Sequence, residues 1–336
     1  MFTDWHWENV GYACGIVLLL VAIFSRKLFS LTAPLVMILY AVGAGFRPLS
    51  YNSDTISYVN HISRSDHVSL SQFVLHERFE PFFSSFTWML TPLFSAQAVL
   101  ISVNLIASVL FVRAFQLGAI HPVIQILIFV EFFVVGSTSI IRFFLAASIV
   151  FFLSVLLFSS SRGAPSLSRP IFGYFIAAGF HLSSVFGYLA WAVQRLRLIS
   201  GALALMSITL FVMIGLEDIL RQFGRGYLIS HEVQSTGLRG FIYLFILLFA
   251  ILTYMRDLVL PVNKDVIAIF KAFMFIASLV AVTQFYPFAN RFLFMAALAM
   301  YAFLAIHPVI QSDRFRWLLY GYAMVAAFYP LLGMLR

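Results

Sequence analysis

Residues 140–159 read IIRFFLAASIVFFLSVLLFS, and Arg142 is the only charged side chain among them. At 1.5 Å per residue, a helix of this length measures about 30 Å, the thickness of the hydrocarbon core of a bilayer. In lipid the backbone must satisfy its own hydrogen bonds, so an apolar stretch of this length predicts a transmembrane α-helix. The stretch therefore predicts an integral membrane protein.

The composition of the whole chain agrees with this prediction. Of its 336 residues, 62% are hydrophobic and 10% are Asp, Glu, Lys or Arg, whereas soluble domains carry roughly 25% charged residues. The mean hydropathy is +0.99, so most of the surface must face lipid. A soluble enzyme, a nucleic-acid binder and a secreted disulfide-linked scaffold are excluded, the last because the chain has a single cysteine.

Most of the chain divides into apolar stretches that are long enough to cross a bilayer. They lie near residues 10–25, 28–46, 95–115, 119–136, 140–159, 198–215, 239–255, 267–285, 288–306 and 316–334. Two further apolar stretches fit badly. Residues 81–93 are short and lie between prolines, and residues 170–194 are interrupted by Gly179 and His181. Short or broken helices at membrane depth indicate a site, because irregular backbone is tolerated there only beside protein or a wet cavity.

The basic residues indicate the orientation, because they favour the cytoplasmic side. The basic loops all lie there only if both badly fitting stretches are re-entrant, which gives about ten spans. The acidic N-terminus and two polar loops, residues 47–80 and 216–238, then lie on the outer face. If both stretches cross completely, there are about twelve spans and several basic loops move outside. The sequence thus predicts an all-α membrane protein with about 10 to 12 transmembrane helices, two outer polar loops and one domain over residues 1–336. Two segments are short or broken, and they are re-entrant in the ten-span arrangement that we favour.

Two arginines lie near the outer ends of predicted spans. A charge inside an apolar helix costs at least about 2.5 kcal/mol on insertion scales, so Arg142 should face a cavity or a partner. Arg291 has the same character, one turn inside the start of its span. One interpretation is a clamp for an anion, and the other is that both side chains extend to the lipid headgroups.

Two other ionisable side chains lie deep within apolar stretches. His181 can take a proton from a hydroxyl group if it lines a cavity, or it can remain neutral and bond to a neighbouring helix. Glu131 is the only acidic residue deep within a span. It is either a proton site or, as we favour, the ion-pair partner of a nearby arginine.

The polar loops add further candidates. Asp54 and Tyr58 lie four positions apart and share one face if this part of the first loop is helical. Arg78 and Glu80 come directly before a badly fitting stretch, where they can reach the membrane surface. At the end of the second loop, Arg239 lies beside glycines, which allow backbone amides and a guanidinium to approach one anion. A solvated loop also carries such residues without any role in binding.

No metal or nucleotide motif is present. The histidines of the first loop lack ligand spacing, and neither Asp-x-Asp nor His-Glu-x-x-His occurs. A P-loop, a dinucleotide fingerprint and a Gly-x-Ser-x-Gly elbow are also absent. The sequence predicts no metal site and no cofactor.

The order of these features resembles the EpsG family, a group of Wzy-type polymerases of bacterial O-antigens and exopolysaccharides. The motifs that carry the resemblance are Asp54 with Tyr58, Glu80-Pro81, Arg142 before Phe143-Phe144-Leu145-Ala146, Phe180-His181-Leu182-Ser183, and Asn290-Arg291-Phe292. Family members typically have Arg-Gln where this chain has Arg142-Phe143, and often Glu-Arg where it has Asn290-Arg291. Both departures keep the arginine.

The resemblance implies an inverting glycosyltransferase that works without a metal ion at the periplasmic face of the bacterial inner membrane. Its substrates would be undecaprenyl-diphosphate-linked oligosaccharides, and the growing chain would pass to a hydroxyl group of the incoming repeat unit. Membrane lipid and a protein that regulates chain length are the implied partners, and nucleic acid is not.

The candidate residues fit that chemistry. Without a divalent ion, a diphosphate leaving group needs fixed cations, and the acceptor hydroxyl needs a base. We assign substrate binding to Arg142, Arg291, Arg239, Arg78 and Tyr58. We assign the base to His181 first, and then to Asp54 or Glu80.

Two alternatives use similar features. A transporter or flippase of lipid-linked oligosaccharides also has broken helices and buried arginines, but the chain shows no inverted repeat. An O-antigen ligase uses the same donor, but its signature is one large outer loop that carries the histidine, whereas His181 lies in a membrane stretch.

Overall fold

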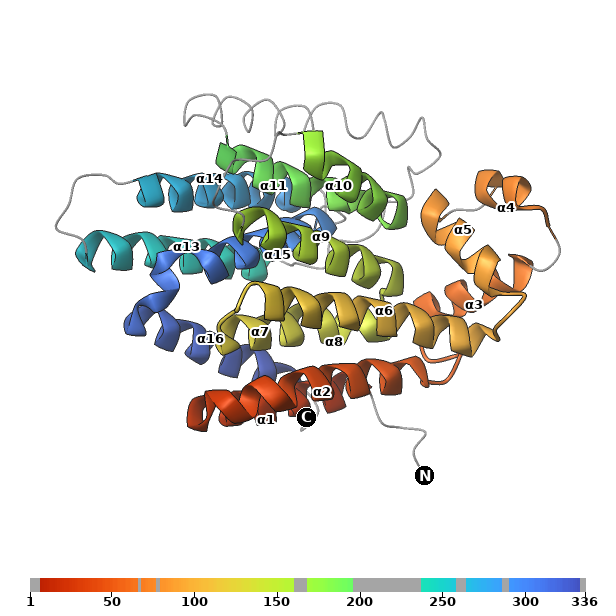
Figure 1. Ribbon diagram of the computed structural model, residues 1–336, viewed down its shortest axis with the longest axis horizontal. Coiled ribbons are helices and arrows are strands. Elements are labelled where there is room, and N and C mark those ends of the chain that lie inside the picture. The colour runs from red at the N-terminus through yellow and green to blue at the C-terminus, as the bar shows by residue number, and fades with distance from the viewer. Residues whose placement is uncertain are drawn as a thin grey trace.

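The computed structural model describes residues 7–65, 68–76, 79–159, 168–195, 237–257, 264–285 and 290–332 (Figure 1). Within these ranges the elements are helices, and no strand occurs. The α-helices are α1 (Trp7–Phe24), α2 (Arg26–Gly45), α3 (Ser53–Ser65), α4 (Leu70–His76), α5 (Pro81–Leu90), α6 (Ala96–Leu117), α7 (Pro122–Ile128), α8 (Val134–Thr138), α9 (Ile141–Ser159), α10 (Ser168–Phe180), α11 (Val185–Arg195), α13 (Gly237–Asp257), α14 (Lys264–Phe285), α15 (Asn290–Ile306) and α16 (Asp313–Leu332). The other turns are the π-helical η1 (Phe129–Phe133) and the 3₁₀ turns η2 (Leu182–Ser184) and η5 (Pro308–Gln311).

The helices confirm a multi-pass membrane protein. Four of them, α1, α2, α6 and α9, are long and apolar enough to cross a bilayer, and shorter apolar helices accompany them. The predicted span at residues 140–159 is α9, within one residue at its start. The predicted span at residues 198–215 and nearly all of the predicted loop at residues 216–238 lie outside the described residues. The number of complete spans stays a prediction.

The long helices form layers. In Figure 1, α1 and α2 lie along one edge of the molecule, α6 and α9 lie in the middle, and α10, α11 and α14 lie toward the opposite edge. Direct packing of α2 on α6, of α6 on α9 and of α9 on α10 and α15 supports this order. As a result α9, which carries Arg142, is covered on several sides by other helices.

Phenylalanine side chains fill the centre of the bundle and fix the start of α9. The ring of Phe144 lies 5.7 Å from that of Phe111 in α6 and 4.9 Å from that of Phe133 in η1, centre to centre. Gly136 makes room for this packing, because a Cβ atom there would lie 2.7 Å from the Phe144 ring. Helix α8 therefore ends directly against the first turn of α9.

The stretch at residues 170–194 forms a helical hairpin. Its first arm, α10, packs along α9, and Tyr174 bonds to Ser154 there over 2.9 Å. The turn comes at His181, whose backbone is extended (φ −160°, ψ 119°) and whose ring lies 5.4 Å from that of Phe143. The turn thus lies beside the first turn of α9, whereas Gln194 near the end of α11 lies beside Phe158 near the end of α9. That this hairpin is re-entrant in a membrane stays a prediction.

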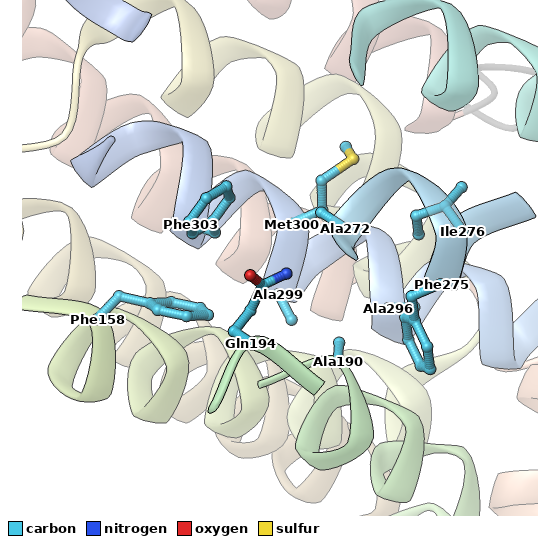
Figure 2. Close-up of a pocket in the computed structure, with 10 residues that line it drawn as sticks. All are labelled: Phe158, Ala190, Gln194, Ala272, Phe275, Ile276, Ala296, Ala299, Met300 and Phe303. Atoms are coloured by element: carbon cyan, nitrogen blue, oxygen red, sulfur yellow. The ribbon is translucent and has the colours of Figure 1, made fainter. Parts of the chain in front are cut away.

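The C-terminal end of α9 is tightly packed. Figure 2 shows Gln194 of α11 among apolar side chains of α9, α14 and α15, around a pocket of about 10 Å³. Such a volume holds about one water molecule. The pocket is therefore too small for a sugar or a diphosphate.

The first predicted loop is itself folded. Helices α3 and α4 lie within residues 47–80, and together with α5 they form a lobe at one end of the bundle, to the right in Figure 1. Pro81 begins α5, where its missing N–H costs no hydrogen bond. This lobe covers the N-terminal end of α9.

Candidate functional site

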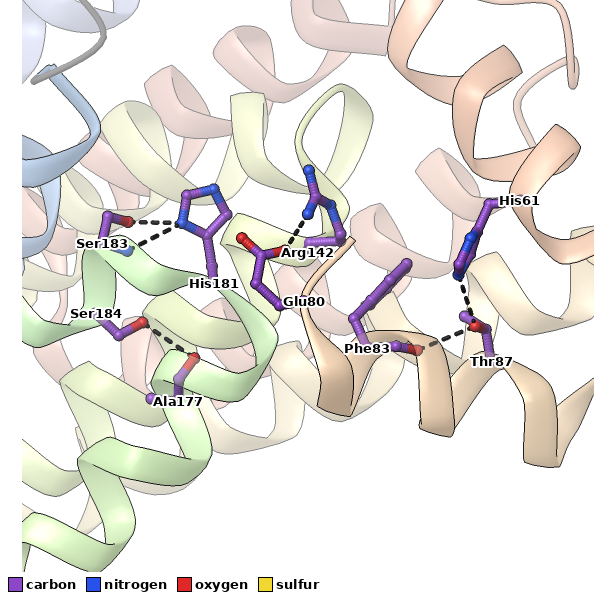
Figure 3. A network of polar contacts seen from close by, with 9 residues as sticks. All are labelled: His61, Glu80, Phe83, Thr87, Arg142, Ala177, His181, Ser183 and Ser184. Atoms are coloured by element: carbon purple, nitrogen blue, oxygen red, sulfur yellow. Dashed lines mark hydrogen bonds and ion pairs between the residues drawn. The ribbon is translucent and has the colours of Figure 1, made fainter. Parts of the chain in front are cut away.

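Arg142 and Glu80 form an ion pair at the junction of the lobe and the bundle. The guanidinium of Arg142, in the first turn of α9, donates to Glu80, the residue before α5 (Figure 3). The two side chains are 15% and 9% exposed. The guanidinium also lies 4.1 Å from the centre of the Phe79 ring, which adds a cation–π contact. Arg142 therefore faces protein rather than the headgroups.

Tyr58 of α3 lies close to several charged candidate residues. Its side chain is buried against Phe79 and Phe83, with ring centres 5.6 and 5.8 Å away. Burial raises the pKa of the Tyr58 hydroxyl and the carboxylate of Asp54 adds to this, whereas Arg142 and Arg291 act in the opposite direction. All of these charges are thus close enough to Tyr58 to affect it, although Asp54 and Arg291 are exposed.

The first turn of α15 supplies Arg291 from the other end of the chain. The next residue, Phe292, stacks on Phe186 of α11 with ring centres 4.2 Å apart. Phe294 contacts Phe143 of α9, with ring centres 6.3 Å apart. These aromatic contacts hold the start of α15 beside the starts of α9 and α11.

His181 lies on the same side of the bundle. The backbone N–H of Ser183 donates to Nδ1 of His181 over 3.4 Å, and Ser183 Oγ lies 2.7 Å from the same nitrogen (Figure 3). A nitrogen that accepts a backbone N–H bears no proton, so in neutral His181 the proton is on Nε2. His181 then presents Nε2–H as a hydrogen-bond donor.

Two helix starts lie close to these side chains. The first turns of α9 and α15 carry Arg142 and Arg291, and Phe143 connects α9 to the His181 turn. Free N–H groups at a helix start favour negative charge. The arrangement of two arginines and helix starts is suited to an anion such as phosphate or diphosphate.

The predicted residues have different outcomes. The structure brings together Tyr58, Asp54, Glu80, Arg142, Arg291 and, through Phe143, His181. Arg78 lies outside the described residues, and the side chain of Arg239 is also not described, although its backbone is in the first turn of α13. In the described ranges, no three His, Cys, Asp or Glu side chains gather where a metal ion could bind.

Sequence reasoning missed the support behind Tyr58. His61 is fully buried, with its ring 4.5 Å from that of Phe73 and 4.4 Å from that of Phe79, centre to centre. Its Nε2 lies 3.1 Å from Thr87 Oγ1 (Figure 3). Its position one turn after Tyr58 was a usable signal, because residues three apart share a helix face. This packing fixes the aromatic rings of Tyr58, Phe79 and Phe83, over which the guanidinium of Arg142 lies.

A second polar cluster surrounds Glu131, which lies in the π-helical turn η1. Tyrosine hydroxyl groups from three helices donate to its carboxylate: Tyr243 of α13, Tyr301 of α15 and Tyr322 of α16. The hydrogen bonds described here come from neutral donors. The arginine that we favoured as its partner stays a prediction.

Comparisons with known proteins give one match. A family model described as the EpsG family matches residues 30–335, nearly the whole chain. Neither a curated protein nor a solved structure shows significant similarity to the chain.

Proposed function

The chain belongs to the EpsG family, and on that premise we propose that it polymerises lipid-linked oligosaccharide repeat units at the periplasmic face of a bacterial inner membrane. The observation that carries the proposal is the convergence of Arg142 and Arg291, each in the first turn of a helix, around Tyr58. Two fixed cations beside helix starts suit a diphosphate.

In the proposed reaction, the donor is a growing glycan on undecaprenyl diphosphate. The bond between its anomeric carbon and the diphosphate oxygen breaks, and the electron pair leaves with the diphosphate. A hydroxyl oxygen of the incoming repeat unit forms the new bond from the opposite face, which inverts the anomeric centre. The hydroxyl proton passes to a base of the protein.

The arginines stabilise the charge that develops on the leaving group. Arg142 and Arg291 donate charge-assisted hydrogen bonds to diphosphate oxygens, and such bonds act most strongly in a site that excludes water. Nε of Arg142 is buried and has no acceptor among the described residues, so the guanidinium has donor capacity beyond Glu80. Glu80 holds Arg142 in place.

The geometry alters our assignment of the catalytic base. In the sequence prediction His181 is the first candidate, but its Nδ1 accepts from Ser183. We therefore propose that His181 donates from Nε2 to a phosphate oxygen and that Asp54, an exposed carboxylate one turn before Tyr58, takes the proton.

The test is a lipopolysaccharide gel from the source bacterium with the gene deleted and then complemented. The complementing genes encode wild type, Arg142→Ala, Arg291→Ala, His181→Ala, Asp54→Asn and the matched control Arg113→Ala, an exposed arginine of α6. A polymerase predicts that deletion removes the long ladder while core with one repeat unit persists. The four site variants should fail to restore the ladder at normal protein levels, and the control should restore it.

Other outcomes oppose the proposal. Loss of the single-repeat band as well would indicate a flippase or a ligase. If the gel is unchanged, the same strains are compared for secreted polysaccharide, and an unchanged yield and chain length there would reject the polymerase.

A further inference from the structure

Arg47, which follows α2 by two residues, is a buried cation that sequence reasoning did not single out. Its side chain is 0% exposed and is among the largest fully buried side chains. Its hydrogen bonds go to neutral groups, and Nη2 has no hydrogen-bond partner among the described residues. A buried charge whose direct hydrogen-bond partners are all neutral is costly for stability, so we looked for a role of Arg47 beyond packing.

The contacts of Arg47 join three elements. Nη1 donates to the carbonyl oxygens of Ala44 in α2 over 2.7 Å and of Ser137 in α8 over 3.0 Å. Nε donates to Thr55 Oγ1 in α3 over 3.1 Å. One guanidinium therefore fixes the end of α2, the end of α8 and the start of α3 relative to one another.

Two of these contacts lie directly beside the candidate site. Thr55 is one helical turn before Tyr58, and Ser137 is five residues before Arg142, across the break between α8 and α9. Asn104 also donates to the Ser137 carbonyl oxygen, over 3.0 Å, so this end of α8 is held from two sides. Arg47 thereby sets the position of Tyr58 against the start of α9.

The charge of Arg47 also reaches the site. Burial lowers the pKa of Arg47 to about 10, and Tyr58 is the first of the nearby groups that act in the opposite direction. The guanidinium therefore stays protonated at pH 7. The carboxylate of Glu8 acts on Arg47 in the same direction as Tyr58. Arg47 is therefore one of three cations, with Arg142 and Arg291, that lie among the carboxylates of Glu8, Asp54 and Glu80.

We propose that Arg47 is a positioning residue for the Arg142 site, which holds Tyr58 against the start of α9 and adds a buried positive charge that favours a bound diphosphate. The inference rests on the proposed function. A neutral donor side chain could form hydrogen bonds to the same carbonyl and hydroxyl groups. A purely structural role of Arg47 would therefore not require its positive charge.

The test separates charge from geometry in the purified full chain. The probe is farnesyl diphosphate, with farnesol as the uncharged control ligand, and binding is measured for wild type, Arg47→Lys, Arg47→Met, Thr55→Val, Arg142→Ala and the control Arg113→Met. Because one charge at close range is removed, Arg47→Met should weaken farnesyl diphosphate binding by about tenfold. Arg47→Lys, Thr55→Val and Arg113→Met should bind within about threefold of wild type, since each keeps the positive charge of the site.

The geometric role is tested with polymerisation of lipid-linked repeat units extracted from the deletion strain. Arg47→Lys and Thr55→Val each lose the contact between Nε and Thr55 Oγ1. Both should lower kcat by about tenfold, because Tyr58 is held less firmly against the start of α9. KM for the donor should stay close to wild type, because residue 47 remains positively charged. Arg113→Met should change neither constant.

The outcomes distinguish the two proposals. If folded Arg47→Met binds the probe as tightly as wild type, or if Arg47→Lys and Thr55→Val keep wild-type kcat and KM while losing only thermal stability, Arg47 is structural and the inference is wrong. If Arg47→Met does not fold, the kcat and KM of the other two variants decide. If wild type does not prefer farnesyl diphosphate to farnesol, or Arg142→Ala binds it equally well, the proposed function itself fails.

Discussion

Two glutamates of this protein, Glu80, which is buried, and Glu131, which is half-buried, differ in their described partners. Glu80, at the end of the bundle covered by the lobe, pairs with the cation of Arg142. Glu131, in the π-helical turn inside the bundle, accepts from neutral tyrosine hydroxyl groups. The Glu80 pair keeps the guanidinium of Arg142 at the junction of the lobe and the bundle. The tyrosines around Glu131 connect η1 to three helices that follow much later in the chain.

The surroundings of the two carboxylates differ as well. Arg142, the partner of Glu80, acts on Tyr58, as do the exposed charged residues Asp54 and Arg291. Beside Glu131 lies a cavity of about 210 Å³, large enough for several water molecules. Its wall consists of Tyr12, Val130, Glu131, Ile242, Tyr322, Val325, Ala326, Tyr329 and Pro330. The difference teaches that the chemistry open to a carboxylate inside the protein depends on its partners, because an arginine and three tyrosines stabilise its charge in different ways.

The largest expected difference between the two regions is in activity. Arg142→Ala should lower the polymerisation rate on the order of 10²-fold or more, because it removes a cation from the leaving group. Glu131→Gln should leave the rate per folded molecule within about threefold of wild type, since an amide oxygen still accepts from the tyrosines. The measurement is polymer formed per amount of protein in purified membranes. Equal losses in both variants would erase the distinction.

The second difference concerns stability. Glu131→Ala leaves the hydroxyl groups of Tyr243, Tyr301 and Tyr322 without their shared acceptor, and bonds to a charged group contribute about 1.5–3 kcal/mol each. We expect a loss of about 3 kcal/mol or more in the free energy of unfolding, seen as a clear fall of Tm in detergent. Glu131→Gln serves as the matched control and should lose less. A Tm equal to wild type for Glu131→Ala would show that the cluster does not hold the helices together.

Single hydroxyl groups sharpen the comparison. Tyr301→Phe removes one donor to Glu131 and should cost about 1–2 kcal/mol of stability, with little effect on the polymerisation rate. Tyr58→Phe should do the reverse, because the Tyr58 hydroxyl interacts with Arg142 at the site. Tm and rate are measured on the same preparations. If both variants change Tm and rate in the same proportion, the two regions do not have separate roles.

The smallest effect is expected at His121, a titratable side chain that lies near two arginines. His121, before α7, lies 3.1 Å from Arg26, and burial together with Arg26 and Arg316 lowers its pKa to about 4. Between pH 6.5 and about 4 the unfolded chain therefore binds more protons at this residue than the folded chain, so stability falls as the pH falls. Because His121 is only half-buried, the fall should be modest.

The check for His121 is the change of Tm between pH 7 and pH 4.5 in wild type and in His121→Asn. Asn keeps an acceptor for the N–H of Val123, which now donates to His121 Nδ1 over 3.3 Å, but it does not titrate. The variant should lose less Tm on acidification than wild type. Identical pH profiles would assign the pH dependence to other groups.

Local patterns predicted much of the fold. The apolar run at residues 140–159 is α9, and the interruption at His181 is the turn of the hairpin between α10 and α11. The i, i+4 spacing of Asp54 and Tyr58 corresponds to positions on α3. These features were predictable because helix length, helix interruption and helix periodicity depend on residues close together in the sequence.

The partners of the charged residues were not predictable in the same way. The pairing of Glu80 with Arg142 joins residues 62 positions apart, and that of Glu131 with Tyr322 joins residues 191 positions apart. Arg47 gave no signal of its own, because a single arginine after a span is expected in a loop. Its burial depends on the ends of α2 and α8 and on α3, which meet only in the folded bundle.

By itself the sequence determined that this chain lies in a membrane, that its elements are helices, and that Arg142, Arg291 and His181 are unusual residues for their surroundings. It did so because a bilayer tolerates only long apolar helices with satisfied backbones, a condition that each segment meets alone. Only the tertiary structure decided which carboxylate pairs with an arginine, which one is held by tyrosines, and that Arg47 is buried behind Tyr58. Those outcomes depend on packing and electrostatics between segments that are distant in the chain. The residues around one such side chain do not indicate which distant residue becomes its partner.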